Sequence, residues 1–351
     1  VVPPNINLSE YRFTVNAEGQ IVYGLGAIKG IGESAIELIC ENRQQDGRFT
    51  SLIDLCKRMV SNKVSRRVYE TLIVSGALDS FGQTRRSLMD YLPDAIRMAT
   101  QYQKDQTVGQ VDLFGGATQA LDGQESEIPE REEWQERERL NKEKKALGLY
   151  LTGHPLNAYE RELKQLRTHW LRDLDDLDGS TFNKVSVLIA GIVSSVRFQP
   201  TEQGRRAFVQ LDDGSSYLEV FIFTNIIEEY GDLIENGELL IVEGVINTDR
   251  RTGTTRLRVT ALYTMETARD VLAQRLLLKI TPPLANDATI DVLQRVFQND
   301  ERRSCGVFIH YETEKATAQI RLGEAYSAPI SDAELKEIEQ LLGESGVKMC
   351  Y

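Results

Sequence analysis

The sequence predicts a multidomain protein with separate α and β parts: a helical domain, a linker, a five-stranded β-barrel and a small C-terminal α+β domain. Three observations lead to this prediction. The chain has 351 residues, more than one domain of the usual size (about 100–200 residues) contains. Apolar residues follow a helical spacing in the first third, and a polar, glutamate-rich stretch comes next. From residue 184 the chain changes to runs rich in Val, Ile, Leu and Phe between turn residues, the pattern of strands.

The N-terminal third is predicted to be helical after an extended start. Residues 1–23 contain prolines and are interpreted as the end of a preceding, fingers-like domain. Residues 24–104 begin with a glycine-rich turn that leads into apolar positions at Ala35, Ile36 and Ile39, and further helical patterns follow. We therefore expect a compact helical unit over residues 24–104.

The middle of the chain is predicted to connect domains. Residues 105–145 are polar, contain glycines and end in "EREEWQERERLNKEKKA", which predicts a solvated spacer helix. Residues 146–183 are interpreted as a helical connector.

The last two domains are predicted from a change of period. Residues 184–265 contain five strand-like runs with a turn at Asp213 and Gly214 and a short helix over residues 225–232. Five antiparallel strands satisfy their edges by closing into a barrel, as in the OB-fold. Residues 266–351 alternate strand-like and helix-like runs, which indicates a small α+β domain.

Charge, cysteines and hydropathy limit the class of protein. The net charge of −12 argues against nucleic-acid binding by the whole surface, but the first 104 residues carry 13 basic and 11 acidic side chains. The four cysteines are widely spaced and include no CxxC pair, so neither zinc binding nor a disulfide framework is indicated. No apolar run is long enough to span a membrane and no signal-peptide pattern is present, so we expect a cytoplasmic protein without membrane contact. The start at Val1 rather than Met suggests a fragment of a longer protein.

A glycine turn near the N-terminus is a candidate phosphate site. Gly30 and Gly32 flank Ile31 directly before a helix, and Lys29 precedes them. Such a turn lets backbone N–H groups approach an anion at the positive end of the helix. The segment resembles the helix-hairpin-helix module, which grips the DNA backbone without reading sequence. The alternative is a plain glycine turn.

Basic residues extend this candidate DNA surface. A basic run crosses a predicted turn of the helical unit, and "SGALDSFGQTRRSL" is interpreted as a degenerate second hairpin whose helix opens with two arginines. Contacts of this kind give weak, salt-sensitive, sequence-independent binding, although each charge alone is more simply explained as a solvated helix face. The basic run comprises Lys57, Arg58, Lys63, Arg66 and Arg67. The predicted contacts to the duplex backbone are Lys29, Gly30, Gly32, Lys63, Arg66, Arg67, Arg85 and Arg86.

The barrel is a second candidate nucleic-acid site. OB-folds bind single strands with basic and aromatic residues, and the predicted contacts here are Arg197, Arg205, Arg206 and Phe208. Alternation along the strands is expected to place some of the aromatic residues in the core. Further aromatic candidates are Phe198, Phe221 and Phe223, and nearby acidic residues leave a purely structural barrel as the alternative.

No catalytic or metal-binding residue is predicted, and no cofactor. The three histidines are isolated, and the acidic pair Asp212 and Asp213 lies in a turn where carboxylates are usually hydrogen-bonded or solvated. The remaining enzyme alternative is a metal-dependent nuclease at that pair.

The stretch "QVDLF" is the third candidate site. Leu113 and Phe114 lie in a polar linker between glycines, where an exposed apolar pair is a recognisable peptide ligand. A small local core is the alternative.

Several ordered signatures together resemble the alpha subunit of bacterial DNA polymerase III. They are "YGLGAIKGIGE", "LIVSGALDSFG", "QVDLF" and "ALGLYLTGHPL", followed by the OB-like and C-terminal segments, and they extend along essentially the whole chain. The resemblance identifies Gln110, Asp112, Leu113 and Phe114 as the peptide that binds the ring-shaped sliding clamp, the beta subunit.

The resemblance also implies a function for the intact protein. It would be a DNA-directed DNA polymerase that uses Mg²⁺, with catalytic aspartates upstream of the helix-hairpin-helix region. This chain would hold duplex DNA and single-stranded template, the clamp, the clamp-loader tau subunit and other replicase subunits. The alternative is a free-standing DNA-binding adaptor without a polymerase, which a start codon near Val1 would indicate.

Overall fold

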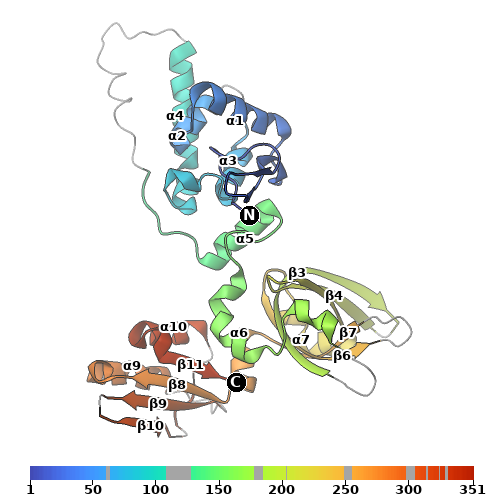
Figure 1. Ribbon diagram of the computed structural model, residues 1–351, viewed down its shortest axis with the longest axis vertical. Helices are drawn as coiled ribbons and strands as arrows, with labels where there is room; N and C mark the ends of the chain where they lie inside the picture. Colours follow the sequence, from blue (N-terminus) through green and yellow to red (C-terminus); the bar gives the residue numbers. More distant parts are fainter. Residues whose placement is uncertain are drawn as a thin grey trace. The chain divides into compact units, whose positions relative to one another are not determined.

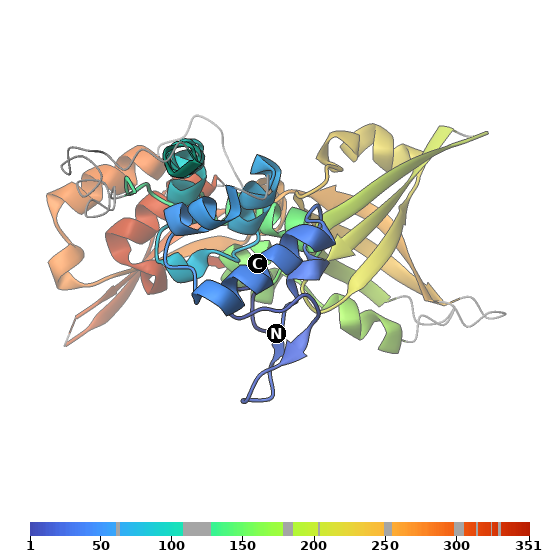
Figure 2. The same ribbon diagram turned by 90° about the horizontal axis from the view of Figure 1, so that it is seen from above.

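The computed structural model describes residues 1–60, 64–107, 128–177, 185–202, 204–248, 255–297, 305–313, 315–323, 325–328 and 331–351. These residues form two compact units, Val1–Pro155 and Leu156–Tyr351 (Figures 1 and 2).

The first unit is mainly helical, as predicted. Its helices begin and end where the sequence supplies caps: the Ser51 hydroxyl accepts the Asp54 N–H at the start of one helix, and Gly148 adopts φ +86° at the end of another. The elements are β1 (Thr14–Val15), β2 (Ile21–Val22), α1 (Glu33–Asp46), α2 (Leu52–Met59), α3 (Arg66–Val74), α4 (Arg85–Thr107) and α5 (Glu136–Leu147).

One hydrophobic core joins the N-terminal segment to these helices. Ile6 is fully buried and Tyr23 is nearly so, and both lie in the same core as α1 to α4. The Tyr23 hydroxyl also donates to the Leu147 carbonyl oxygen at 2.9 Å. The predicted domain boundary between residues 23 and 24 therefore does not separate two hydrophobic cores.

Helix α5 is confirmed as a helix, but the prediction that it is solvated is wrong. Leu140, Ala146 and Leu147 are buried, and the last two belong to the core of the helical unit. A few apolar residues in a run of charges give a weak periodic signal, so sequence spacing did not separate a half-buried helix from a solvated one.

The second unit contains the predicted barrel. Its strands close in the order β3-β4-β5-β7-β6, and all neighbours but one are antiparallel. The expectation of a fully antiparallel barrel is wrong for β5 and β7, which pair in parallel where the barrel closes. A short helix, α7 (Thr224–Tyr230), follows β5 as expected. The strands are β3 (Val185–Thr201), β4 (Gly204–Asp212), β5 (Tyr217–Ile222), β6 (Leu239–Thr248) and β7 (Thr255–Tyr263).

The hairpin of β3 and β4 extends beyond the closed barrel, as Figure 2 shows most clearly. The strands stay paired from Ile192 and Asp212 to Thr201 and Gly204. The barrel half of β3 is largely buried, whereas residues 197–200 are exposed. This extension carries several of the predicted single-strand contacts.

The C-terminal part is the predicted small α+β domain. A sheet in the order β10-β9-β8-β11 packs its apolar side chains against α9 and α10. Buried Arg269 joins three helices, because its guanidinium contacts Glu162 of α6 and Asp332 of α10 at 2.7 Å each. The elements are α6 (Glu160–Leu166), α8 (Met265–Leu272), β8 (Arg275–Ile280), α9 (Asp287–Phe297), β9 (Gly306–Glu312), β10 (Thr317–Arg321), α10 (Asp332–Leu342) and β11 (Val347–Cys350).

The described residues contain neither a membrane-spanning helix nor a metal-binding cluster. None of the helices described there is both long and apolar enough to cross a membrane. Within the same parts of the chain, no cluster of three or more His, Cys, Asp or Glu side chains has the arrangement of a metal site.

Candidate nucleic-acid interface

The first glycine turn has the geometry of an accessible anion site. Gly30 adopts φ +87°, a conformation that favours glycine, and a Cβ added at Gly30 or Gly32 would meet no atom within 4 Å. The N-cap of α1 is Gly32, which supplies no side-chain hydrogen bond to the first turn. Because helix N-terminal N–H groups attract anions, an exposed, uncapped glycine start can admit a phosphate.

Lys29 lies where the prediction requires it, on the surface beside this turn. Its backbone N–H donates to the Ala146 carbonyl oxygen at 2.8 Å, so the turn is fixed to the end of α5. Glu33 in the first turn of α1 is exposed and would oppose a phosphate, so Lys29 also offsets a local negative charge.

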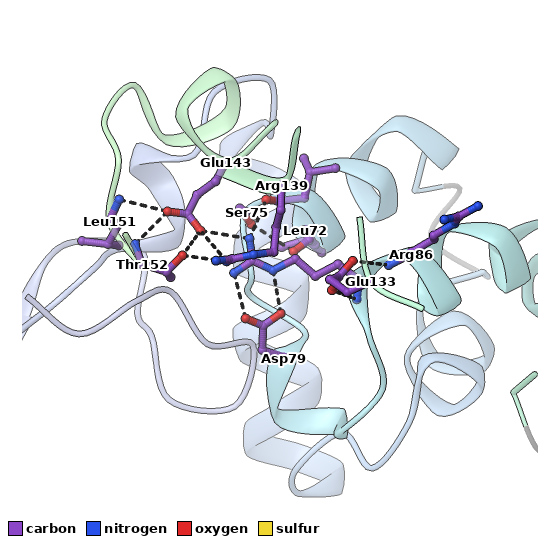
Figure 3. A network of polar contacts seen from close by, with 11 residues as sticks. Leu72, Ser75, Asp79, Arg86, Glu133, Arg139, Glu143, Leu151 and Thr152 are labelled. Carbon is purple, nitrogen blue, oxygen red and sulfur yellow. Dashed lines mark hydrogen bonds and ion pairs between the residues drawn. The ribbon is translucent and has the colours of Figure 1, made fainter. Parts of the chain in front are cut away.

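The prediction that Arg85 contacts DNA is wrong, because its side chain is only 3% exposed. Its guanidinium makes two hydrogen bonds to the Asp79 carboxylate, at 2.8 and 2.9 Å, and one to Glu143 at 2.9 Å. Figure 3 shows the Asp79 and Glu143 carboxylates on opposite sides of this network. Arg85 therefore joins the second hairpin to α5 instead of facing solvent.

The start of α4 is also occupied by a carboxylate of the chain. Glu133 accepts the backbone N–H groups of Arg85 at 2.8 Å and Arg86 at 3.2 Å. The Arg131 N–H donates to the Ser87 hydroxyl at 2.8 Å and holds the same segment in place. At the second hairpin, the Glu133 carboxylate therefore occupies the helix N-terminus where an anion would bind. At the first hairpin, the N-cap Gly32 supplies no side-chain hydrogen bond to that position.

Three of the other predicted duplex contacts lie on the surface, and one lies outside the described residues. Arg67 and Arg86 are exposed, and Figure 3 shows the Arg86 side chain pointing away from the buried network. Arg66 is exposed and forms an ion pair with Glu70 at 2.7 Å. Lys63 lies outside the described residues.

A row of side chains crosses the outer face of the barrel. Arg197 of β3 is paired with Phe208 of β4, Phe208 with Phe221 of β5, and Phe221 with Arg258 of β7. The Arg197 guanidinium carbon lies 4.6 Å from the centre of the Phe208 ring, and the two phenyl rings lie 5.1 Å apart. We call Arg197, Phe208, Phe221 and Arg258 the outer-face row. Cations and aromatic faces in this arrangement suit stacked bases and phosphates.

A groove of about 1070 Å³ lies along this face. Arg206 and Phe223 border it, with the Arg206 guanidinium carbon 5.3 Å from the Phe223 ring centre. Glu228 also lines the groove and lowers its positive potential. Such a groove can hold an extended polar ligand along an aromatic floor.

Strand alternation separates Arg205 from the other predicted contacts. Residues next to each other on a strand point to opposite faces, so Arg205 lies on the face opposite Arg206. Its guanidinium carbon is 5.1 Å from the ring of Phe198, which is paired with the buried Ala207. The expectation that some aromatics lie in the core is wrong for these residues, because the four phenylalanines named are all partly or largely exposed. They are Phe198, Phe208, Phe221 and Phe223.

Arg258 was not predicted, and Phe221 and Phe223 were only secondary candidates. Arg258 joins the row through the parallel pairing of β5 and β7, which are far apart in the sequence. That β7 lies beside β5 can be inferred only from how the barrel closes and from the register of its strands. The alternate spacing of Phe221 near the end of β5 and Phe223 just after it was the available signal for those two.

The acidic turn is structural, as the sequence suggested. Asp213 accepts the N–H groups of Ser215 and Ser216 through one oxygen, and the N–H of Leu171 through the other. Asp212 accepts the Gly214 N–H at 3.0 Å. These carboxylates hold the β4–β5 turn, and nothing in their geometry favours the nuclease alternative.

The peptide predicted to bind the clamp, Gln110, Asp112, Leu113 and Phe114, lies outside the described residues.

Comparisons with known proteins agree with the fold. A family described as the helix-hairpin-helix motif matches residues 1–88, and one described as the OB-fold nucleic acid binding domain matches residues 187–264. A solved structure titled "OBody AM1L10 bound to hen egg-white lysozyme" covers 28% of this chain and 91% of its own, at 17% identity. Its TM-score is 0.21.

Curated relatives match nearly the whole chain. DNA polymerase III subunit alpha of Escherichia coli (strain K12) is 35% identical over 350 residues, which are 99% of this chain and 30% of that protein. The subunit of the same name from Vibrio cholerae is 34% identical over the same shares. The chain thus spans about 30% of the length of these relatives. It is homologous along nearly its whole length to the bacterial DNA polymerase III alpha subunits, and its helix-hairpin-helix and OB-fold domains fit the C-terminal region of that family.

Proposed function

We propose that this chain is the DNA- and partner-binding C-terminal region of a cytoplasmic, replicative DNA-directed DNA polymerase. The supporting observation is the match to the polymerase subunits over 99% of the chain, together with the matches to a helix-hairpin-helix motif and an OB-fold. Nucleotide addition, with its Mg²⁺ ions, belongs in this proposal to the part of the longer protein that the chain does not cover. The chain itself retains the polymerase on its template.

The helical unit would grip the duplex backbone. The turn at Gly30 and Gly32 would receive a phosphate at the start of α1, and Lys29 would neutralise it. Arg66, Arg67, Arg86 and Lys63 remain proposed contacts, whereas Arg85 is removed from the set because it is buried. Binding should not depend on base sequence, since backbone groups and phosphates are the partners.

The barrel would hold the single-stranded template on the outer-face row. The aromatic rings there supply stacking surfaces, and Arg197, Arg206 and Arg258 supply the positive charge that a strand of phosphates requires. Arg205 and Phe198, on the opposite face of the β3–β4 hairpin, would contribute less.

Replacing Phe208 with alanine is expected to weaken binding of a single-stranded oligonucleotide by about 1–3 kcal/mol, the usual value of one stacked base. Fluorescence anisotropy with a labelled oligo(dT), using the full chain at fixed salt, measures this change. Phe198→Ala is the matched control, because Phe198 is 45% exposed on the same hairpin but on its other face. Equal losses in both variants would show that the outer-face row is not the binding surface.

The remaining partners rest on the family resemblance. Gln110, Asp112, Leu113 and Phe114 would bind the sliding clamp, and the C-terminal α+β domain would dock the clamp-loader tau subunit. With both the clamp and the DNA held, dissociation would require both contacts to open. Processive synthesis would follow from this double attachment.

A further inference from the structure

The first hairpin turn and the end of α5 form one continuous edge. The Lys29 N–H donates to Ala146 at 2.8 Å, and the hydroxyl of buried Tyr23 donates to the Leu147 carbonyl oxygen at 2.9 Å. These bonds fix the last turn of α5 beside the candidate phosphate site. A ligand at the turn would therefore also meet the end of α5.

Gly148 has no side chain, and this leaves room at this edge for the Lys29 side chain. It adopts φ +86°, and a Cβ there would lie 3.0 Å from the Lys29 Nζ and 3.2 Å from its Cε. A side chain at residue 148 would therefore be both strained and crowded by the lysine. The glycine lets the Lys29 ammonium group lie across the end of α5.

Positive charge gathers at this edge. Lys144 and Lys145 occupy the last turn of α5 next to Lys29. The Lys144 Nζ lies 4.3 Å from the centre of the Tyr150 ring, while Lys145 is exposed. The neighbouring carboxylate of Glu143 is fully buried and paired with Arg85, so it does not offset the charge of the exposed Lys145 at the surface.

We propose that the last turn of α5 is a second wall of the duplex-phosphate site, with Lys145 contacting a phosphate next to the one held at Gly30 and Gly32. This inference rests on the proposed duplex binding and adds an element that the sequence assigned to a linker. The partner is the phosphate backbone of duplex DNA, recognised by charge and not by base sequence. Lys29 would bridge the two walls.

The test is the salt dependence of duplex binding by the full chain. One phosphate contact contributes about 0.9 to the slope of log K against log salt concentration, so Lys145→Ala should make the slope shallower by about 1. The loss of affinity should be the same on two duplexes of unrelated sequence, and Lys145→Arg should restore the slope. A lysine that only complements the helix dipole would change stability slightly and leave the slope unchanged.

Two further variants separate the possible outcomes. Lys104→Ala removes an exposed lysine from the last turn of α4 and should leave the slope unchanged. Gly32→Val should fold, since a Cβ at Gly32 meets nothing within 4 Å, but it should weaken duplex binding by blocking the turn. If Gly32→Val weakens binding while Lys145→Ala keeps the wild-type slope, the proposed phosphate contact of Lys145 is wrong. The proposed duplex binding at Gly30 and Gly32 is then supported. If the wild-type chain binds no duplex at low salt, both proposals are wrong.

Discussion

Replacing Leu113 and Phe114 together with alanine is expected to abolish binding of the chain to a bacterial sliding clamp. Burial of two large apolar side chains in a partner pocket is worth about 3–6 kcal/mol. Since each 1.4 kcal/mol is tenfold, the dissociation constant should rise by about 10²–10⁴. Surface plasmon resonance with immobilised clamp, at constant salt, measures the change directly.

The matched control for this prediction is Leu121→Ala, which removes one apolar residue from the same linker but lies outside the pentapeptide. It should bind the clamp as the wild type does. Equal binding by wild type and the double variant would contradict the clamp assignment, and Leu113 and Phe114 would then more reasonably belong to a local core.

Replacing Glu143 with alanine is expected to destabilise the helical unit by about 3–5 kcal/mol, because it breaks a buried ion pair and leaves the Arg85 guanidinium with Asp79 as its one carboxylate partner among the described residues. Glu143 is 0% exposed and also accepts the N–H groups of Leu151 and Thr152, at 2.9 and 2.8 Å (Figure 3). The change would therefore disturb both the second hairpin and the loop after α5.

Urea unfolding of the full chain can isolate this effect. The chain has two tryptophans, so in a Trp170→Phe background the fluorescence of Trp134 reports on the helical unit. The matched control is Glu138→Ala on the same helix, where a 51% exposed carboxylate pairs with Lys142 and contributes about 0–1 kcal/mol. Comparable destabilisation by the two variants would show that the buried network does not hold the unit together.

The same network should make the stability of the helical unit depend on pH. Burial raises the pKa of Glu143, but hydrogen bonds from Thr152 and Leu151 and the Arg85 guanidinium outweigh burial, so its pKa is lowered. A lowered carboxyl pKa adds stability above the unfolded value of about 4.3, and this stability is lost as the pH falls through the folded pKa. In the Trp170→Phe background, the unfolding midpoint should therefore fall more steeply below about pH 5 with Glu143 present than in Glu143→Gln. Parallel curves would contradict this assignment.

The sequence predicted the order and type of the domains well, because periodicity and turn residues report directly on local structure. The barrel is the best case: alternating runs and the Asp213–Gly214 turn indicated its strands, and the closed order confirms the barrel. Helix α5 was identified as a helix for the same reason. Its burial was missed, because a charged helix becomes buried only through partners distant in the sequence, such as Tyr23 and Arg85.

The candidate sites were predicted less completely, because their members meet only in three dimensions. Arg85 has the same sequence context as the exposed Arg86, and only the Asp79 and Glu143 carboxylates distinguish them. Arg258 enters the outer-face row through a parallel pairing that local patterns do not encode. By contrast, the candidate phosphate site at Gly30 depends only on the conformation of that glycine and on an exposed turn, and a short sequence motif can specify both.

The most direct test of the central claim is binding of the full chain to a duplex with a single-stranded overhang, compared with the duplex and the single strand alone. If the helical unit holds the duplex and the barrel holds the template strand, linkage of the two should make the junction bind tighter than either separate ligand, by about tenfold or more. Phe208→Ala should remove most of that gain and leave duplex binding unchanged. A junction that binds no tighter than the plain duplex would contradict the claim that the two modules act on one template.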